Sequence, residues 1–367
     1  MRTPTPRTPL AALAGMVLVV TGCTGEPDTG PDTGPGGGSQ AGSSSAQPTP
    51  RGTGPTSPSP TPTEPEEPAL PPVDSPVSLP AVMREEARGE LDGSRLRQVE
   101  VIEETDAYTR AIVTYESRDL TVSGVLLRPR GRGPFPGVVL NHGYIEPSVY
   151  APGQGMAREQ DYLARAGYAV LHTDYRGHAS GDPASDLDRE SRLGYARDAV
   201  TAVRSLAREP YVDADRLGMV GRSMGGGVTL SALVVAPDLV DAAVVHASVS
   251  SDYVDNLEQF TEPGRPEQAR ELYDELGGPP SGNPEPYRQL SPRTYFDRVS
   301  DPVLAIHGDV DDTCPPPWAD ATQRALVRAG ADAQLETYPG EGHTFYAGWQ
   351  SMIERTDEFL TTRMGAA

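Results

Sequence analysis

From residue 137 onward, short apolar segments alternate with longer segments that have helical spacing. The apolar segments are of strand length and end at turn residues, as in "YAVLHTDYRG" (168–177). Strands that alternate with helices in this way pair in parallel, because each helix returns the chain across one face of the sheet. The sequence therefore predicts an α/β fold with a mostly parallel central sheet and helices on both faces. We expect strands at 137–142, 168–177, 216–221, 241–247, 302–308 and 333–339, and helices at 158–167, 192–209, 223–236, 318–330 and 349–364.

Two segments depart from this alternation. Residues 107–128 alternate apolar and polar side chains around "SRD", which predicts an antiparallel hairpin at the start of the domain. Residues 248–299 are rich in Pro, Gly, Tyr and charged residues, and we interpret them as a cap inserted over the strand ends, where ligands bind in open α/β sheets. A long solvated connection is the alternative. The aromatic side chains that would line an apolar pocket or pack within the cap are Tyr253, Phe260, Tyr273 and Tyr287.

The N-terminal part of the chain has the composition of an export signal followed by a tether. Residues 1–22 place two arginines ahead of an apolar run too short to span a bilayer, which is typical of a secretory signal peptide. The run ends in "VTGC", which resembles a bacterial lipobox with Cys23 as the lipidated residue; an ordinary signal with an incidental cysteine is the alternative. Residues 23–80, rich in Gly, Pro, Ser and Thr, predict a disordered tether. We therefore expect one folded domain at 81–367, exported and lipid-anchored to the outer face of the cell membrane.

The charge and composition of the chain exclude several classes of function. The formal net charge is -21, which argues against binding to nucleic-acid backbones. All 31 basic residues are Arg, so mechanisms that need a P-loop lysine, a Schiff-base lysine or a Ser-Lys dyad are excluded. The chain has two cysteines. If Cys23 carries lipid, Cys314 has no partner, and we expect no disulfide.

The segment "GMVGRSMGGGVTL" (218–230) contains a G-x-S-x-G pattern centred on Ser223. The pattern alone is weak evidence, because this chain contains 39 glycines. Its context is stronger: an expected strand leads into Ser223 and an expected helix follows, which is the arrangement that exposes a nucleophilic serine on a tight turn. Gly221 and Gly225 leave room for that turn. We therefore expect Ser223 to be a nucleophile.

A nucleophilic serine needs a base that is itself oriented by an acid, and in this fold they follow in the chain order Ser, Asp, His. His343 is the histidine that follows the acidic cluster, so chain order selects it. Three carboxylates compete for the acid, Asp309, Asp311 and Asp312, and spacing from the strand does not separate them. The cluster lacks the Gly and Glu of a calcium loop, so we expect no metal. Three other histidines lie in or at the ends of apolar strands and are expected in the core: His172, His246 and His307.

Two backbone N–H groups are expected to stabilise negative charge on a substrate carbonyl oxygen. One belongs to Met224, the residue after the nucleophile. The other lies in the loop after the first parallel strand, where Gly143 permits a close approach and Tyr144 supplies the N–H. The sequence therefore predicts an oxyanion hole formed by Tyr144 and Met224.

These motifs, in this order, resemble the α/β-hydrolase superfamily, most closely the catalytic domain of the prolyl oligopeptidase family and its single-domain esterase-like relatives. The resemblance covers about residues 105–367 and implies an α/β-hydrolase catalytic domain. In that family the acid is the third residue after a His-Gly pair, which implies Asp311. The chain departs from the family at Arg222, where an aromatic residue or His is commoner, and no β-propeller is expected ahead of the domain. The matching segments are "NHGY" (141–144), "DYRG" (174–177), "GRSMGGG" (221–227), "HGDVDD" (307–312) and "GEGH" (340–343).

The sequence thus predicts an extracytoplasmic serine hydrolase that cleaves carboxylic esters through an acyl-enzyme and needs no cofactor. A serine peptidase of the same mechanism is the alternative, and a non-catalytic surface-binding module on a hydrolase fold is a third reading. The expected partners are a small ester or short peptide substrate and, through lipid on Cys23, the membrane; no nucleic acid is expected.

Overall fold

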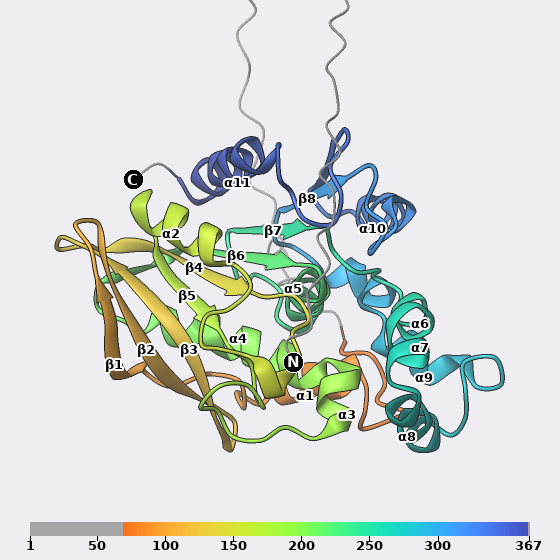
Figure 1. Ribbon diagram of the computed structural model, residues 1–367. Helices are drawn as coiled ribbons and strands as arrows, with labels where there is room; N and C mark the ends of the chain where they lie inside the picture. The colour runs from red at the N-terminus through yellow and green to blue at the C-terminus, as the bar shows by residue number, and fades with distance from the viewer. Residues whose placement is uncertain (1–68, 366–367) are drawn as a thin grey trace, which may run out of the picture. The chain divides into compact units, whose positions relative to one another are not determined.

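A sheet of nine strands runs through residues 69–365, the part of the chain that the computed structural model describes (Figure 1). The strand order is β1-β2-β3-β5-β4-β6-β7-β8-β9. The pairs from β1 to β5 are antiparallel, and those from β5 through β4 to β9 are parallel. The predicted α/β class with a mostly parallel sheet is confirmed. The strands are β1 (Arg97–Glu104), β2 (Tyr108–Ser117), β3 (Leu120–Pro129), β4 (Phe135–Asn141), β5 (Ala169–Thr173), β6 (Val212–Arg222), β7 (Ala242–His246), β8 (Val303–Gly308) and β9 (Ala333–Tyr338).

The antiparallel part of the sheet contains the predicted hairpin and one strand that was not predicted. β2 and β3 form the hairpin, with Ser117 paired to Leu120. The turn residue Arg118 adopts a left-handed φ of 57°. β1 precedes the hairpin as an edge strand whose eight residues are all exposed. Its sequence, "RQVEVIEE", has no regular alternation, and neither face of the strand is buried.

Helices cover both faces of the sheet, as predicted. Helices α1, α4, α5 and α10 contribute to one apolar core, and α2 and α11 contribute to the other. Successive side chains of a strand point to opposite faces, so Met219 of β6 lies in the first core and Val220 in the second. The helices outside the cap are α1 (Leu79–Ala87), η1 (Pro147–Val149), α2 (Ala157–Arg165), α3 (Asp186–Ser191), α4 (Leu193–Ala207), α5 (Met224–Val235), α10 (Pro316–Ala329) and α11 (Trp349–Met364).

The segment 248–299, expected to be an inserted cap, folds into a group of short helices that includes α6 to α9 (Figure 1). Three of its aromatic side chains pack within the cap or against the neighbouring helices α3 and α10. Tyr253 and Tyr287 are buried, and their hydroxyls donate to the carbonyls of Glu190 and Gly278, each at 2.7 Å. Phe260 packs edge-on against a tryptophan of α10. The elements are α6 (Tyr253–Asn256), η2 (Leu257–Thr261), α7 (Glu262–Gly264), α8 (Pro266–Leu276), α9 (Pro284–Leu290) and η3 (Pro292–Arg298).

The packed domain begins slightly before the boundary expected at residue 80. Ser78 caps α1 by accepting the Ala81 N–H at 3.2 Å, and Leu79 is fully buried. The first turn of α1 thus includes residues that we had assigned to the tether. The expected signal peptide (1–22), Cys23 and the tether up to residue 68 lie outside the described residues. Among residues 69–365, none of the helices has the length and apolar character needed to cross a membrane.

Candidate active site

Ser223 occupies the sharp turn between β6 and α5. Its φ of 56° and ψ of -120° are unusual for a residue with a side chain, so the surrounding packing must hold the turn in place. Two glycines make the turn sterically possible. A Cβ at Gly225 would lie 1.9 Å from the Asn141 carbonyl oxygen, and one at Gly221 would lie 2.3 Å from the Gly225 oxygen. The predicted strand–turn–helix context of Ser223 is therefore present.

The three residues expected to form a triad are brought together from three loops. His343 Nε2 lies 3.0 Å from Ser223 Oγ, and His343 Nδ1 lies 2.9 Å from Asp311 Oδ2. All three side chains follow the carboxyl ends of parallel strands: Ser223 follows β6, Asp311 follows β8 and His343 follows β9. The carboxyl ends of neighbouring parallel strands meet at one edge of the sheet. Residues far apart in the sequence thus form one continuous hydrogen-bonded chain.

Asp311 is held rigidly as an anion. Its Oδ1 accepts the backbone N–H groups of Thr313 and Cys314 at 2.9 and 2.8 Å. Its Oδ2, besides facing His343, lies 3.4 Å from His307 Nε2. Burial acts to raise the pKa of Asp311, but hydrogen bonds from the two histidines and from the backbone outweigh it and hold this pKa well below its ordinary value.

The other two candidate carboxylates, Asp309 and Asp312, have different hydrogen-bond partners. Asp309 Oδ1 accepts the Gly340 N–H at 2.7 Å and so ties the strand end to the loop that carries His343. Asp312 accepts only a long contact of 3.4 Å from the Thr313 hydroxyl. Within residues 69–365, neither of them bonds to His343. The geometry therefore separates three acids that spacing alone left equivalent.

The two N–H groups expected to form an oxyanion hole flank Ser223. Met224 is the first residue of α5, and N–H groups in a first helical turn lack an intrahelical acceptor. The loop of Gly143 also lies against Ser223, since a Cβ at Gly143 would be 3.1 Å from Ser223 Cβ. The ring of His142 contacts the Gly143 carbonyl at 2.6 Å. Because the C=O and N–H of a trans peptide point in opposite directions, this contact turns the Tyr144 N–H away from that ring.

The histidines expected in the core are buried, as predicted. His172, His246 and His307 are each at most 2 % exposed. His246 bonds to Thr356 Oγ1 at 2.8 Å, and burial together with the Arg222 charge lowers the pKa of His246 to about 3. His307 has a further role that the sequence did not reveal. It bonds to the Cys314 carbonyl at 2.8 Å while facing Asp311, so it helps to fix the acid.

Arg222, the residue that departs from the family pattern, is bonded to the histidine loop. Its guanidinium donates to Thr344 Oγ1 at 2.8 Å and to the His343 carbonyl at 3.5 Å. The side chain before Ser223 thus holds the backbone of the expected base. Composition gave no signal for this contact, because it joins residues that are distant in the sequence.

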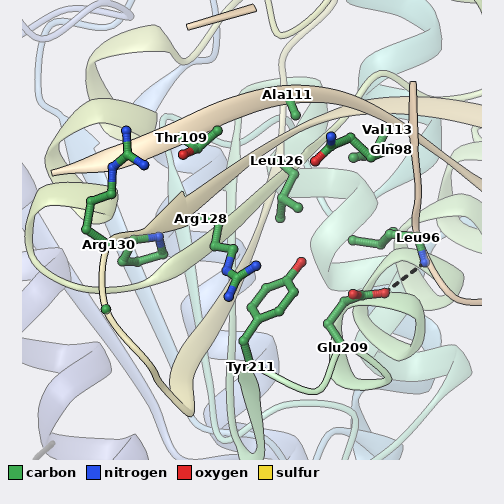
Figure 2. Close-up of a pocket in the computed structure, with 12 residues that line it drawn as sticks. Leu96, Gln98, Thr109, Ala111, Val113, Leu126, Arg128, Arg130, Glu209 and Tyr211 are labelled. Atoms are coloured by element: carbon green, nitrogen blue, oxygen red, sulfur yellow. Dashed lines mark hydrogen bonds between the residues drawn. The ribbon is translucent and has the colours of Figure 1, made fainter. Parts of the chain in front are cut away.

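One pocket of the fold, shown in Figure 2, lies away from this site. This pocket of about 370 Å³ is lined by β1, β2, β3 and the residues that precede β6. The Arg128 guanidinium lies 4.2 Å above the Tyr211 ring, and the Leu96 N–H donates to Glu209 Oε1 at 3.0 Å. Tyr211 precedes β6, whereas Ser223 follows it. The pocket and the candidate active site are therefore at opposite ends of the same strand.

A protein-family model matches most of the folded part of the chain. Residues 155–365 match the model of the prolyl oligopeptidase family. The chain belongs to the prolyl oligopeptidase family. It is accordingly a serine hydrolase with an α/β-hydrolase fold, as the motifs predicted.

Similar proteins carry the names of peptidases. The chain is 28% identical over 242 residues to the uncharacterized peptidase YuxL of Bacillus subtilis, a match that covers 63% of this chain and 35% of that protein. It is 29% identical over 201 residues to the uncharacterized peptidase YtmA of the same organism, covering 54% of this chain and 72% of that protein. This chain thus spans about a third of the length of the first relative.

Solved structures of a peptidase and of an esterase have the same fold. Acylaminoacyl peptidase of Pyrococcus horikoshii aligns with a TM-score of 0.57 and 22% identity, covering 72% of this chain and 43% of that one. Acetyl xylan esterase 1 of Thermoanaerobacterium sp. JW/SL YS485 aligns with a TM-score of 0.56 and 20% identity, covering 77% of this chain and 94% of that one. At these identities the likeness establishes the fold.

Proposed function

We propose that this protein hydrolyses carboxylic esters, with Ser223 as nucleophile, His343 as general base and Asp311 as the acid that orients His343. The observation that carries the proposal is the continuous chain of contacts from Ser223 Oγ through both nitrogens of His343 to Asp311 Oδ2, at 3.0 and 2.9 Å. A serine hydroxyl becomes an effective nucleophile when a neutral imidazole can take its proton as it attacks.

The reaction follows from this arrangement in two halves. Ser223 Oγ attacks the ester carbonyl while His343 Nε2 takes the hydroxyl proton, and the negative oxygen is stabilised by the N–H groups of Tyr144 and Met224. The tetrahedral adduct collapses as His343 returns the proton to the departing alcohol, which leaves an acyl group on Ser223. Water then repeats the sequence with His343 as base, and the acid product is released. Asp311, as an anion, stabilises the imidazolium formed in each half.

The preference for esters over peptides rests on what surrounds the triad. Peptide cleavage requires binding groups that hold the scissile amide in register, and the amine must be protonated as it leaves. Tyr253 and Tyr287 are buried and their hydroxyls are bonded to backbone carbonyls, so they are not free to form a peptide-binding wall. Acetyl xylan esterase 1, whose own length is almost wholly matched, shares the fold and supports an esterase of this size.

A direct comparison of substrates tests the proposal. We expect kcat/KM on a short-chain p-nitrophenyl ester to exceed that on alanyl or prolyl p-nitroanilides by at least about 10³-fold, and Ser223→Ala to abolish both ester turnover and labelling by a fluorophosphonate. Turnover of a p-nitroanilide or peptide with kcat/KM above roughly 10⁴ M⁻¹s⁻¹ would instead establish a peptidase. A folded protein whose Ser223 resists the fluorophosphonate would be a binding module.

We also propose that the protein is exported and held at the outer face of the cell membrane by lipid on Cys23. The lipobox-like "VTGC" and the Gly- and Pro-rich segment after it support this location. Cys23→Ser should release active enzyme into the soluble fraction, because residues 69–365 contain the whole candidate site. A free N-terminus at Thr24 or later on most wild-type molecules would rule out the anchor.

A further inference from the structure

Arg192 lies at a junction between two helices, beside the first turn of α5. It is the residue between α3 and α4, where a left-handed φ of 61° breaks what would otherwise be one helix. One nitrogen of its guanidinium lies 3.9 Å from where a Cβ would stand on Gly227, in the first turn of α5. Ser223 immediately precedes that helix. The charged end of Arg192 is therefore close to the nucleophile.

A second observation concerns the buried Cys314 thiol. The charge of Arg192 and a hydrogen bond with Ser223 both act to lower the pKa of Cys314, which places the thiol near both residues. Burial, with a contribution from the Asp311 charge, raises the pKa of Cys314 to about 12, so the thiol is neutral and gives Arg192 no counter-ion. The neutral thiol therefore does not pair with the guanidinium, although the Glu190 charge acts to raise the pKa of Arg192.

The nearby carboxylate is already used by other groups. Glu190 is 3% exposed on its side chain, and it binds Arg265 Nε at 2.9 Å and Arg189 Nε at 3.3 Å. Its second oxygen binds Arg265 again at 3.0 Å and the Thr261 hydroxyl at 3.3 Å. Arg192 is half-buried, and among residues 69–365 no partner forms a hydrogen bond or salt bridge with its guanidinium.

An unpaired, partly buried guanidinium is costly to the fold, because charge is removed from water without compensation. Burial lowers the pKa of Arg192, but a guanidinium remains charged at neutral pH. Arg265 lies 4.8 Å above the Tyr144 ring, but its charge is paired with Glu190. The N-terminus of α5 contributes a positive potential. Arg192 thus supplies a positive charge without a salt bridge of its own, in a chain whose formal net charge is -21.

We propose that the Arg192 guanidinium binds a carboxylate of the substrate beside Ser223, so that the preferred esters carry an acidic group a few bonds from the scissile carbonyl. This inference rests on the proposed esterase function. A guanidinium binds a carboxylate through two parallel N–H···O bonds, which fixes the orientation of the substrate as well as its position. Since the protein as a whole repels anions, the site acts through recognition after encounter rather than through long-range attraction.

Paired substrates test the proposal. On the acyl side, 4-nitrophenyl hydrogen glutarate is compared with neutral 4-nitrophenyl pentanoate; on the alcohol side, 4-acetoxybenzoate is compared with 4-acetoxybenzamide. We expect the anionic-to-neutral ratio of kcat/KM to fall roughly 10- to 100-fold in Arg192→Gln for one of the two pairs, and by less in Arg192→Lys. The pair that responds identifies the side of the ester that carries the acid. Arg328→Gln, an exposed site on α10 with the same charge change, should leave both ratios unchanged.

A second measurement is independent of ester turnover. Glutarate should slow fluorophosphonate labelling of Ser223 in the wild-type protein more than neutral glutaramide does, and Arg192→Gln should remove the difference. If this protection is seen but no ester is hydrolysed, the carboxylate site stands and the proposed esterase function fails. Equal protection by glutarate and glutaramide in the wild-type protein, or unchanged substrate ratios in Arg192→Gln, would overturn the proposal. The wild-type comparison decides the matter even if the variants do not fold.

Discussion

Replacing Asp311 by Asn tests the assignment of the acid with a change of almost no volume. Asp311 Oδ1 accepts two backbone N–H groups at 2.9 and 2.8 Å, so the amide oxygen of the variant must stay in that position. The NH₂ group then takes the place of Oδ2 and faces His343 Nδ1, which lies 2.9 Å away. An amide nitrogen donates and does not accept, so Nδ1 must become the acceptor.

This exchange forces the wrong tautomer on the base. With Nδ1 accepting, the proton of neutral His343 lies on Nε2, the atom 3.0 Å from Ser223 Oγ, and Nε2 then has no lone pair for the hydroxyl proton. In the flipped amide orientation, the NH₂ group would face two backbone N–H donors. That orientation costs more free energy, because it leaves those donors without an acceptor. The same exchange in a Ser-His-Asp protease lowers kcat about 10⁴-fold, which corresponds to roughly 5.4 kcal/mol of transition-state stabilisation.

The assay is kcat on a p-nitrophenyl ester, with circular dichroism to show that each variant is folded. Asp309→Asn and Asp312→Asn are the matched controls, because they make the same change in the same loop without contacting His343, and each should lower kcat by less than about 10-fold. A severe loss in Asp312→Asn together with a mild loss in Asp311→Asn would refute the tautomer argument and the choice of acid.

Three further predictions follow from particular contacts. Gly225→Ala should leave little folded protein, because its Cβ would lie 1.9 Å from a backbone oxygen, whereas Gly264→Ala, with no atom within 4 Å, should be close to neutral in thermal denaturation; equal stabilities would contradict this. Arg222→Met should lower kcat by roughly 10-fold with little change in KM, and Thr344→Val should give the same loss, so that the double variant is no worse than either single one. Additive losses would show that the contact is not what positions the base. Asp301, whose pKa burial raises to about 6, holds a proton more tightly in the folded protein, so the wild type loses stability as pH rises from about 4 to 6. As pH rises over that range, the free energy of urea unfolding of Asp301→Asn should therefore increase relative to that of the wild type by up to roughly 3 kcal/mol. A relative decrease with rising pH would exclude burial of this carboxyl as the cause.

The parallel strands were predictable because their signal is local. β8, for example, begins with the apolar run "VLAI", and every one of its residues is buried. β1 had no such signal, since all its residues are exposed and neither of its faces is buried. The first turn of α1 was missed for another reason. Its buried side chains pack on helices far along the chain, including α5, so a Pro-rich local composition suggested a tether instead.

The junction at Arg192 shows a second limit of local reasoning. Residues 192–209 have helical spacing throughout, and we expected one helix beginning at Arg192. In the structure that residue separates α3 from α4 with a left-handed φ, a conformation usually signalled by Gly or Asn. Nothing in the residue type marks the break. The position of the Arg192 guanidinium near Ser223 could therefore not be predicted from the sequence, because it depends on how α3, α4 and α5 pack together.

The choice of acid depends on a contact between two loops rather than on either loop alone. A Cβ at Gly308 would lie 2.1 Å from the Glu341 carbonyl oxygen, so the end of β8 and the loop of His343 touch through their backbones. Asp309 strengthens that contact by accepting a backbone N–H of the second loop. Only with the loops held in this way does the next acid along the turn, Asp311, face His343. Spacing within the first loop could not distinguish these carboxylates, because what separates their roles is the position of a second segment some thirty residues later.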